Sequence, residues 1–117
     1  AGLEKRLKIM FDDSDQRIMV ALDHNDKVVG WIHVYIARRL EIEVFVEIGG
    51  LVVDEKCRRM GVGKALMQAA EDWEIARDIR VIRLRSNMIR AEAHQFYLEL
   101  GFNREKQQQV FTKMLMG

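Results

Sequence analysis

A turn between two predicted elements constrains this chain more than any other stretch. The apolar segment GLVVD, residues 50–54, predicts a strand, and a helix with an apolar face is predicted from Val62 onward. Gly61 and Gly63, separated by one residue and preceded by two arginines, lie where the turn meets the start of the helix. Glycine permits positive φ and close approach of the backbone to a ligand, and a helix start offers unpaired N–H groups with partial positive charge. The turn is therefore a predicted anion site, with phosphate as the first choice.

The rest of the chain predicts further short helices and strands. Apolar residues recur at helical spacing from Leu3 to Phe11, so the chain is expected to open in a short helix that ends before DDSDQ. Strands at 18–22 and 28–36, joined at Asn25 and Asp26, are predicted next. A strand at 44–53 follows, with a bulge or close backbone approach at Gly49 and Gly50. The remaining predicted elements are a helix from 62 to about 79, a strand at 81–86, a helix at 91–100 capped by Gly101, a weaker strand at 103–106 and a final strand at 110–116.

The order of these elements predicts the fold class. A strand, the glycine turn, a helix and a further strand form a βαβ unit, which favours a parallel strand pair around the turn. The other strands are expected to be antiparallel. The sequence thus predicts one α/β domain over residues 1–117, with a central mixed, mostly antiparallel sheet flanked by helices.

Charge and composition limit the partners and the compartment. The net charge is +1, so no large positive field favours nucleic acid as a partner. A single cysteine excludes an internal disulfide and multi-cysteine zinc frameworks, and the three histidines lack metal-ligand spacing, so we expect no metal. No apolar run reaches membrane-spanning length and no signal-peptide pattern opens the chain. We expect a cytoplasmic protein without a membrane partner.

Two common phosphate-binding loops do not match the turn. A Walker A loop requires Ser or Thr after Gly-Lys, but Ala65 follows Gly63-Lys64. A dinucleotide-binding fingerprint requires a third Gly or an Ala where this chain has Leu66. Neither loop is predicted.

The pattern that remains is Arg58-x-x-Gly61-x-Gly63, which resembles the acyl-CoA-binding motif [QR]xxGx[GA] of the GNAT N-acetyltransferase superfamily. The stretch LVVDEKCRRMGVGKAL resembles the family's strand, loop and helix, and AHQFYLELGF resembles its later helix ending in Tyr-x-x-x-Gly-Phe. The resemblance covers about residues 17–115. It implies a GNAT-like acyl-CoA N-acyltransferase fold, with the parallel strand pair splayed at the cofactor site and acetyl-CoA as cosubstrate.

The resemblance also implies which residues bind the cofactor. In the family, backbone N–H groups of the loop wrap the pyrophosphate of coenzyme A, and free backbone groups of the preceding strand pair with pantetheine. The matching loop residues are Arg58, Arg59, Met60, Gly61, Val62, Gly63 and Lys64, and the matching strand residues are Leu51, Val52 and Val53. Asn87 follows a predicted strand where the family often has a cofactor-contacting Asn, although a turn or cap residue would fit equally well.

Acetyl transfer to an amine calls for a base and an acid. An amine with a pKa near 10.4 is neutral in only about one molecule in 10³ at pH 7, so a positioned base helps. The spacing of Glu47 to Arg58 matches the general-base glutamate of histone-acetylating members, with Glu43 as the fallback. A solvated or ion-paired strand face is the alternative account of Glu47.

Tyr97 matches the family's tyrosine near the coenzyme A sulfur, which serves as general acid in many members. A phenol is a suitable proton donor to a leaving thiolate. Phe96 and Tyr97 both lie near an apolar helix face, however, and one of them would also fit as a core residue. Several arginines lie close together later in the chain, and they would suit the 3′-phosphate of coenzyme A, an acidic partner or a solvated face. These arginines are Arg77, Arg80, Arg83, Arg85 and Arg90.

These residues together predict an acetyl-CoA-dependent N-acetyltransferase that uses direct attack in a ternary complex. The acceptor is a small-molecule or peptide amine of unspecified identity. The alternative is a non-catalytic acyl-CoA-binding or interaction module of the same fold. Family members usually begin with a strand and a helix that this sequence does not contain, so we expect an exposed edge on the strand that starts near Arg17. Either further residues precede this sequence, or a second subunit of a homodimer covers that edge.

Overall fold

The computed structural model describes residues 6–39, 43–58, 60–84, 91–103 and 111–115. The chain divides into two compact units, residues 1–85 and 86–117, and each is treated by itself. The elements of the first unit are β1 (Arg6–Asp12), β2 (Gln16–Leu22), β3 (Val28–Arg39), β4 (Glu43–Val53), the 3₁₀ helix η1 (Glu55–Cys57), α1 (Val62–Ala76) and β5 (Ile82–Leu84); the second unit contains α2 (Ala91–Glu99). No helix in the described part of the chain is long and apolar enough to cross a membrane.

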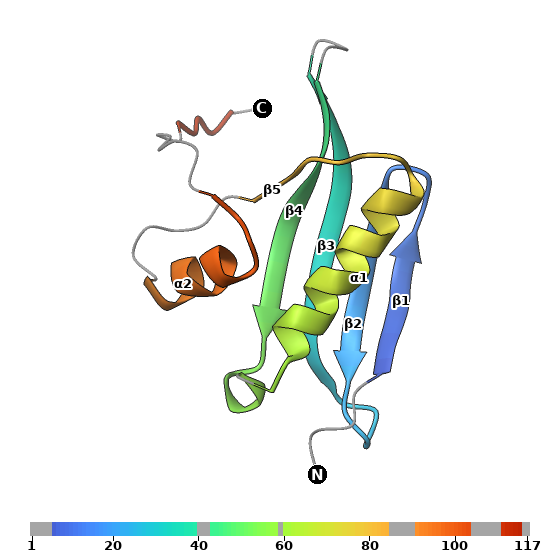
Figure 1. Ribbon diagram of the computed structural model, residues 1–117, viewed down its shortest axis with the longest axis vertical. Coiled ribbons are helices and arrows are strands. Elements are labelled where there is room, and N and C mark those ends of the chain that lie inside the picture. The colour runs from blue at the N-terminus through green and yellow to red at the C-terminus, as the bar shows by residue number, and fades with distance from the viewer. Residues whose placement is uncertain (1–5, 40–42, 59, 85–90, 104–110, 116–117) are drawn as a thin grey trace. The chain divides into compact units, whose positions relative to one another are not determined.

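The first unit is a five-stranded mixed sheet with α1 laid across it (Figure 1). The strand order is β1-β2-β3-β4-β5, with antiparallel neighbours throughout except for the parallel pair β4-β5. The predicted fold class and the predicted parallel pair around the glycine turn are both confirmed.

The predicted opening helix is wrong. Residues 6–12 form β1, which pairs antiparallel with β2, with a register irregularity between Ile9 and Phe11. Leu7, Ile9 and Phe11 also alternate with period two, and an isolated helix this short is only marginally stable in water, whereas pairing with β2 satisfies the backbone of one edge. The exposed edge predicted on the strand near Arg17 is therefore also wrong, because β1 covers it and itself becomes the edge strand.

The core of this unit lies between α1 and one face of the sheet. A Cβ built on Gly30 of β3 would lie 3.0 Å from Val62 and 3.2 Å from Leu66, so the helix packs almost directly on the β3 backbone. The buried residues contributed by α1 are Val62, Leu66, Met67, Ala70 and Trp73, and those of the sheet include Met19, Ala21, Ile32, Val34, Val46 and Ile48. The apolar stripe predicted for this helix is confirmed at its N-terminal and middle turns.

Side chains alternate along β3, so the residues between those facing α1 lie on the opposite side of the sheet. Gly30 and Ile32 belong to the α1 side. Trp31, His33 and Tyr35 therefore belong to the other side, and so does Glu47, which is directly opposite Tyr35 in the β3–β4 register. We call this side the second face of the sheet.

The second unit contains α2 and its C-terminal cap. The helix ends as predicted at Gly101, which has φ 95°. The Gly101 N–H donates to the Leu98 carbonyl at 3.1 Å and the Phe102 N–H donates to the Tyr97 carbonyl at 3.0 Å, as in a glycine-terminated helix.

The final strand predicted at 110–116 is not observed in residues 111–115. An apolar run does not form a strand without a partner backbone, and the apolar side chains here are almost fully exposed, at 89% for Phe111 and 85% for Met114. Most of the weaker strand predicted at 103–106 lies outside the described residues.

Candidate active site

The glycine turn is built from η1, an extended residue and a left-handed glycine. Asp54 begins η1 and its carboxylate accepts a hydrogen bond from the Lys56 N–H at 3.0 Å. Arg58 then adopts extended backbone, and Gly61 has φ 81°, the left-handed region that favours glycine. Gly61 occupies the N-cap position of α1 without a side-chain hydrogen bond to cap the helix. The first N–H groups of α1 are thus not capped by a side chain and suit an anion.

One residue of the turn anchors it to the core while its neighbours face solvent. The side chain of Val62, the first residue of α1, is fully buried in the core, whereas Arg58, Met60 and Lys64 are exposed. The buried Val62 side chain anchors the turn, and the exposed residues of the turn include the two cations Arg58 and Lys64. Arg59 lies outside the described residues.

The strand that leads into the turn runs beyond its described pairing with β5. The parallel ladder extends from Val46 opposite Ile82 to Ile48 opposite Leu84, while β4 continues to Val53. Leu51 and Val53 are half-buried and Val52 is exposed. These three residues pair with β3 along the edge of β4 that faces away from β5. Asn87 lies outside the described residues, so its cofactor contact stays a prediction.

Glu47 lies on the second face, next to a tyrosine. The Tyr35 hydroxyl donates a hydrogen bond to Glu47 Oε2, and both side chains are half-buried. The His33 ring lies 5.6 Å from the Tyr35 ring, centroid to centroid, and His33 Nε2 is 3.0 Å from Gln16 Oε1 on β2. Polar side chains from three adjacent strands therefore meet beside the predicted base.

Two glycines of β4 make room for the aromatic rings of β3. Gly49 is the extra residue of a β-bulge, since His33 is opposite Gly50 while Val34 is opposite Ile48. A Cβ on Gly49 would lie 2.8 Å from His33 Nδ1, and one on Gly50 would lie 2.6 Å from the Trp31 ring. Of the two alternatives predicted from the Gly-Gly pair, the bulge is confirmed.

Sequence reasoning missed Tyr35, His33 and Trp31 as neighbours of the site. The signal was present in the alternation of VVGWIHVYIARR, which puts these three residues on one face of a strand. The pairing register between β3 and β4, which brings Tyr35 opposite Glu47, was not readable from that pattern.

Glu43, the fallback base, is engaged differently. It forms an ion pair with Arg83 of β5, whose guanidinium also lies 4.4 Å from the centre of the Phe45 ring. Glu47 therefore stays the predicted base and Glu43 the fallback.

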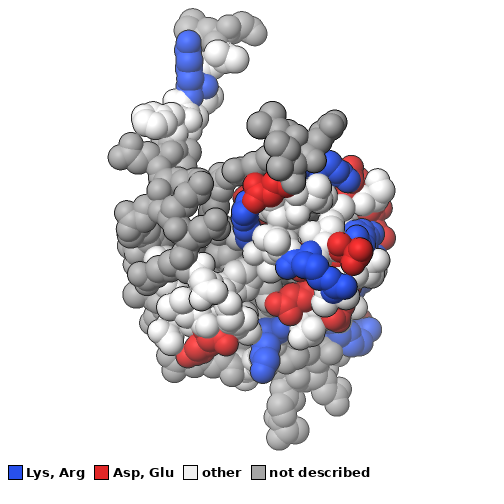
Figure 2. Space-filling model, turned by 45° about the horizontal axis from the view of Figure 1, so that its top comes forward, with Lys and Arg blue, Asp and Glu red and all other residues white. Residues whose placement is uncertain are grey.

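The arginines of the later sequence are dispersed among separate partners. Arg77 stacks 4.1 Å from the centre of the Trp73 ring, and Arg80 forms an exposed ion pair with Asp78 at 3.4 Å. Arg85 and Arg90 lie outside the described residues. Figure 2 shows basic and acidic side chains intermingled over the described part of one face.

Tyr97 belongs to the second unit and packs among aromatic rings. Its ring lies 5.4 Å from Phe96 and 5.9 Å from Phe102, centroid to centroid, in edge-to-face arrangements. The side chain is half-buried on α2. Its predicted role as the acid stays a prediction.

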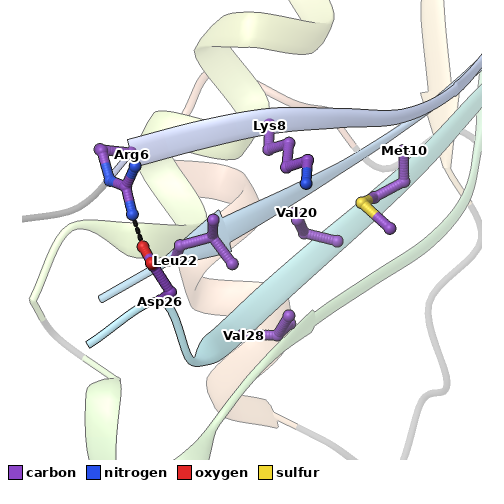
Figure 3. A pocket seen from close by; sticks show the side chains of 7 residues that line it. All are labelled: Arg6, Lys8, Met10, Val20, Leu22, Asp26 and Val28. Carbon is purple, nitrogen blue, oxygen red and sulfur yellow. Dashed lines mark ion pairs between the residues drawn. The ribbon is translucent and has the colours of Figure 1, made fainter. Parts of the chain in front are cut away.

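A shallow hollow of about 470 Å³ lies among β1, β2 and the β2–β3 turn (Figure 3). Val20 at its floor is opposite Trp31, so the hollow opens on the second face. An ion pair between Arg6 and Asp26 closes one end. None of the predicted catalytic or cofactor-binding residues lines it. In the described part of the chain, no cluster of three or more His, Cys, Asp or Glu side chains has the geometry of a metal site.

Solved structures with this fold include several acetyltransferases. An aminoglycoside acetyltransferase, meta-AAC0020 from an uncultured soil metagenomic sample, superposes with a TM-score of 0.77 at 24% identity over 90% of this chain and 69% of its own. AAC(6′)-Iy, in complex with the bisubstrate analogue CoA-S-monomethyl-acetylneamine, gives a TM-score of 0.78 at 17% identity over 88% of this chain and 72% of its own. At these identities the likeness shows the fold.

Sequence comparison identifies the family. An uncharacterised N-acetyltransferase of Bacillus subtilis, YhdJ, is 37% identical over 59 residues, which are 50% of this chain and 42% of that protein. The matched region thus spans less than half the length of this relative. The model of the acetyltransferase (GNAT) family matches residues 2–102. With the mixed sheet, the parallel β4-β5 pair and the glycine turn at the start of α1, this match shows that the chain belongs to the GNAT family of acetyltransferases.

Proposed function

We propose that the protein is an acetyl-CoA-dependent N-acetyltransferase that acts on a primary amine by direct attack in a ternary complex. One observation carries the proposal. The strand that holds Glu47, β4, leads through η1 directly into a turn where Gly61 is left-handed and α1 starts without a side-chain cap. A predicted base and a predicted phosphate site are therefore parts of one continuous segment of the first unit.

The turn suits the pyrophosphate of coenzyme A. The backbone N–H groups at the start of α1, together with the exposed cations Arg58 and Lys64, offer charge-assisted hydrogen bonds of about 1.5–3 kcal/mol each. The helix terminus adds up to about 1 kcal/mol per favourable charge. The backbone of residues 51–53 is the proposed contact for pantetheine. Bound in this way, acetyl-CoA supplies an activated thioester carbonyl.

Glu47 is the proposed base for the incoming amine. An ammonium first loses its extra proton to solvent, and the neutral amine attacks the thioester carbonyl. As the C–N bond forms, the Glu47 carboxylate accepts one proton from the attacking nitrogen, directly or through water. The C–S bond then breaks, and the leaving thiolate receives a proton from Tyr97, the proposed acid. From the neutral amine onward, one proton leaves the nitrogen and one reaches the sulfur.

The acceptor proposed first is a small, amine-rich molecule. Among the solved structures with this fold, meta-AAC0020 is described as an aminoglycoside acetyltransferase, and AAC(6′)-Iy is in complex with the bisubstrate analogue CoA-S-monomethyl-acetylneamine. The half-buried carboxylate of Glu47 is compatible with such an amine, and also with a peptide amine. An amine panel should therefore contain aminoglycosides, polyamines, and peptides with a free N-terminus or a lysine.

A thiol-release assay with this panel tests the proposal. We expect acetyl-CoA-dependent thiol release with at least one amine, and a loss of about 10²-fold or more in kcat for Glu47→Gln. Glu43→Gln is the matched comparison, since Glu43 lies on the same strand and pairs with Arg83; its loss should be much smaller. Acetyl-CoA binding without thiol release for any amine would instead identify a non-catalytic acyl-CoA-binding module.

A further inference from the structure

We infer that Tyr35 is a positioning residue for Glu47, holding one carboxylate oxygen so that the side chain faces its acceptor amine in a single orientation. This inference rests on the proposed function, because it assigns Tyr35 a role only through Glu47. The inference extends the proposed function by naming a residue on a different strand, outside the acyl-CoA motif.

The pairing register supports the inference directly. Tyr35 and Glu47 are opposite one another in the β3–β4 ladder, and the Tyr35 hydroxyl donates to Glu47 Oε2. Both side chains lie on the second face, which α1 does not cover. The pair is half-buried and stands apart from the core between α1 and the sheet, so the core does not require it.

The tyrosine ring is itself held by neighbours. The His33 ring lies against it at 5.6 Å with an interplanar angle of 42°, and His33 Nε2 is within hydrogen-bond distance of Gln16 Oε1 at 3.0 Å. Side chains of β2, β3 and β4 therefore form one continuous series that ends at the carboxylate. Such support restricts the rotamers of a catalytic side chain.

The backbone of β4 is shaped to accept these rings. Gly49 is the extra residue of the bulge, and a Cβ there would lie 2.8 Å from His33 Nδ1 and 3.2 Å from Tyr35 Cε1. Any other residue would push the rings away from the strand that bears Glu47. Bulges beside active sites commonly re-aim a side chain in this manner.

In the sheet register Glu47 lies between Tyr35 of β3 and Arg83 of β5. Arg83 also forms an ion pair with Glu43, and His33 lies against the Tyr35 ring. The Tyr35 hydroxyl is a neutral donor, so its hydrogen bond orients one carboxylate oxygen without adding a charge.

A double-mutant cycle in the full chain tests the role. For Tyr35→Phe, which keeps the ring and removes the hydroxyl, we expect kcat to fall about tenfold while KM for acetyl-CoA and for the amine stay within about twofold. In the Glu47→Gln background, Tyr35→Phe should cause no further loss. Gly49→Ala, which keeps both functional groups and displaces the rings, should also lower kcat. Arg38→Gln, an exposed change on the same strand, serves as the control and should leave kcat unchanged.

The outcomes separate the inference from the proposed function. If Glu47→Gln loses activity and Tyr35→Phe does not, or if the two losses multiply, the role of Tyr35 is overturned and the base assignment stands. If Glu47→Gln keeps wild-type kcat, the base assignment fails and the inference fails with it. Melting temperatures with and without acetyl-CoA, measured for each variant, identify any loss of kcat that comes from unfolding.

Discussion

At the scale of single residues, the two glycines of the turn have different physical roles. Gly61 has φ 81°, a conformation that costs a residue with a Cβ roughly 1–2 kcal/mol. Gly63 lies within the first turn of α1 and is not among the described glycines with positive φ. Backbone strain therefore explains Gly61, and close approach to a ligand is the reason we assign to Gly63.

Alanine at each position distinguishes these roles. Gly61→Ala should lower the free energy of unfolding by about 1 kcal/mol and weaken acetyl-CoA binding. Gly63→Ala should leave the fold at least as stable, because alanine favours helix by up to about 1 kcal/mol, and should still weaken binding. Urea unfolding and calorimetric titration give the two quantities. Unchanged acetyl-CoA affinity in Gly63→Ala would contradict close backbone approach at this residue.

Glu74 is a buried carboxyl on α1 with an exposed fraction of 4%. Burial, helped by the nearby carboxylate of Glu71, raises its pKa from the ordinary 4.5 to about 7. The unfolded chain therefore loses this proton at lower pH than the folded chain does. Above the ordinary pKa the unfolded state binds fewer protons, so the contribution of Glu74 to stability falls as pH rises from about 4.5 to about 7.

Removing this charge should flatten that pH dependence. We expect Glu74→Gln to be more stable than wild type at about pH 8 and close to wild type at about pH 5, as measured by urea unfolding at both values. Asp72→Asn, an exposed change on the same helix, should show no such difference. Equal effects of Glu74→Gln at both pH values would contradict the shifted pKa.

At the scale of elements, most strands and helices followed from local patterns. The β2–β3 hairpin, β4 with its bulge, and α2 with its Gly101 cap were readable because each depends on neighbouring residues. The first strand was not readable, because Leu7 and Phe11 fit a helical pattern together with Met10 and an alternating pattern together with Ile9, and only the pairing with β2 decides between them. The apolar residues of 111–115 likewise did not specify a pairing partner.

The end of α1 shows how backbone geometry overrides an apolar pattern. The predicted helix ran to Ile79, but α1 ends at Ala76 because Asp78 turns left-handed at φ 59°. The Ile79 N–H donates to the Glu74 carbonyl at 3.2 Å and the Asp78 N–H donates to the Ile75 carbonyl at 2.9 Å. These two bonds form a Schellman cap with aspartate in the place usually held by glycine.

This cap gives a direct stability prediction. Asp78→Gly should raise the free energy of unfolding by up to about 1 kcal/mol, because glycine adopts the left-handed conformation without a steric penalty. Asp78→Ala also removes the carboxylate but keeps a Cβ, so it should not stabilise the protein. Thermal or urea unfolding of both variants checks the prediction, and equal stabilisation by glycine and alanine would contradict it.

At the scale of the whole molecule, the sequence predicted the local geometry of the glycine turn better than the surroundings of Glu47. The turn is contiguous, so Arg58, Gly61 and Gly63 were recognisable as one motif. The surroundings of Glu47 depend on Tyr35, which is 12 residues away along the chain and is brought opposite it by the sheet register. Such cross-strand pairs are set by the fold and have no local sequence signature.

The central claim is that the turn at the start of α1 binds acetyl-CoA, and calorimetric titration of acetyl-CoA into the full chain tests it most directly. We predict saturable binding with a Kd below about 1 mM, equivalent to more than about 4 kcal/mol. The same ligand should raise the melting temperature, and acetyl thioesters that lack the pyrophosphate should not compete. No binding at 1 mM acetyl-CoA and no rise in melting temperature would contradict the claim that the turn binds acetyl-CoA.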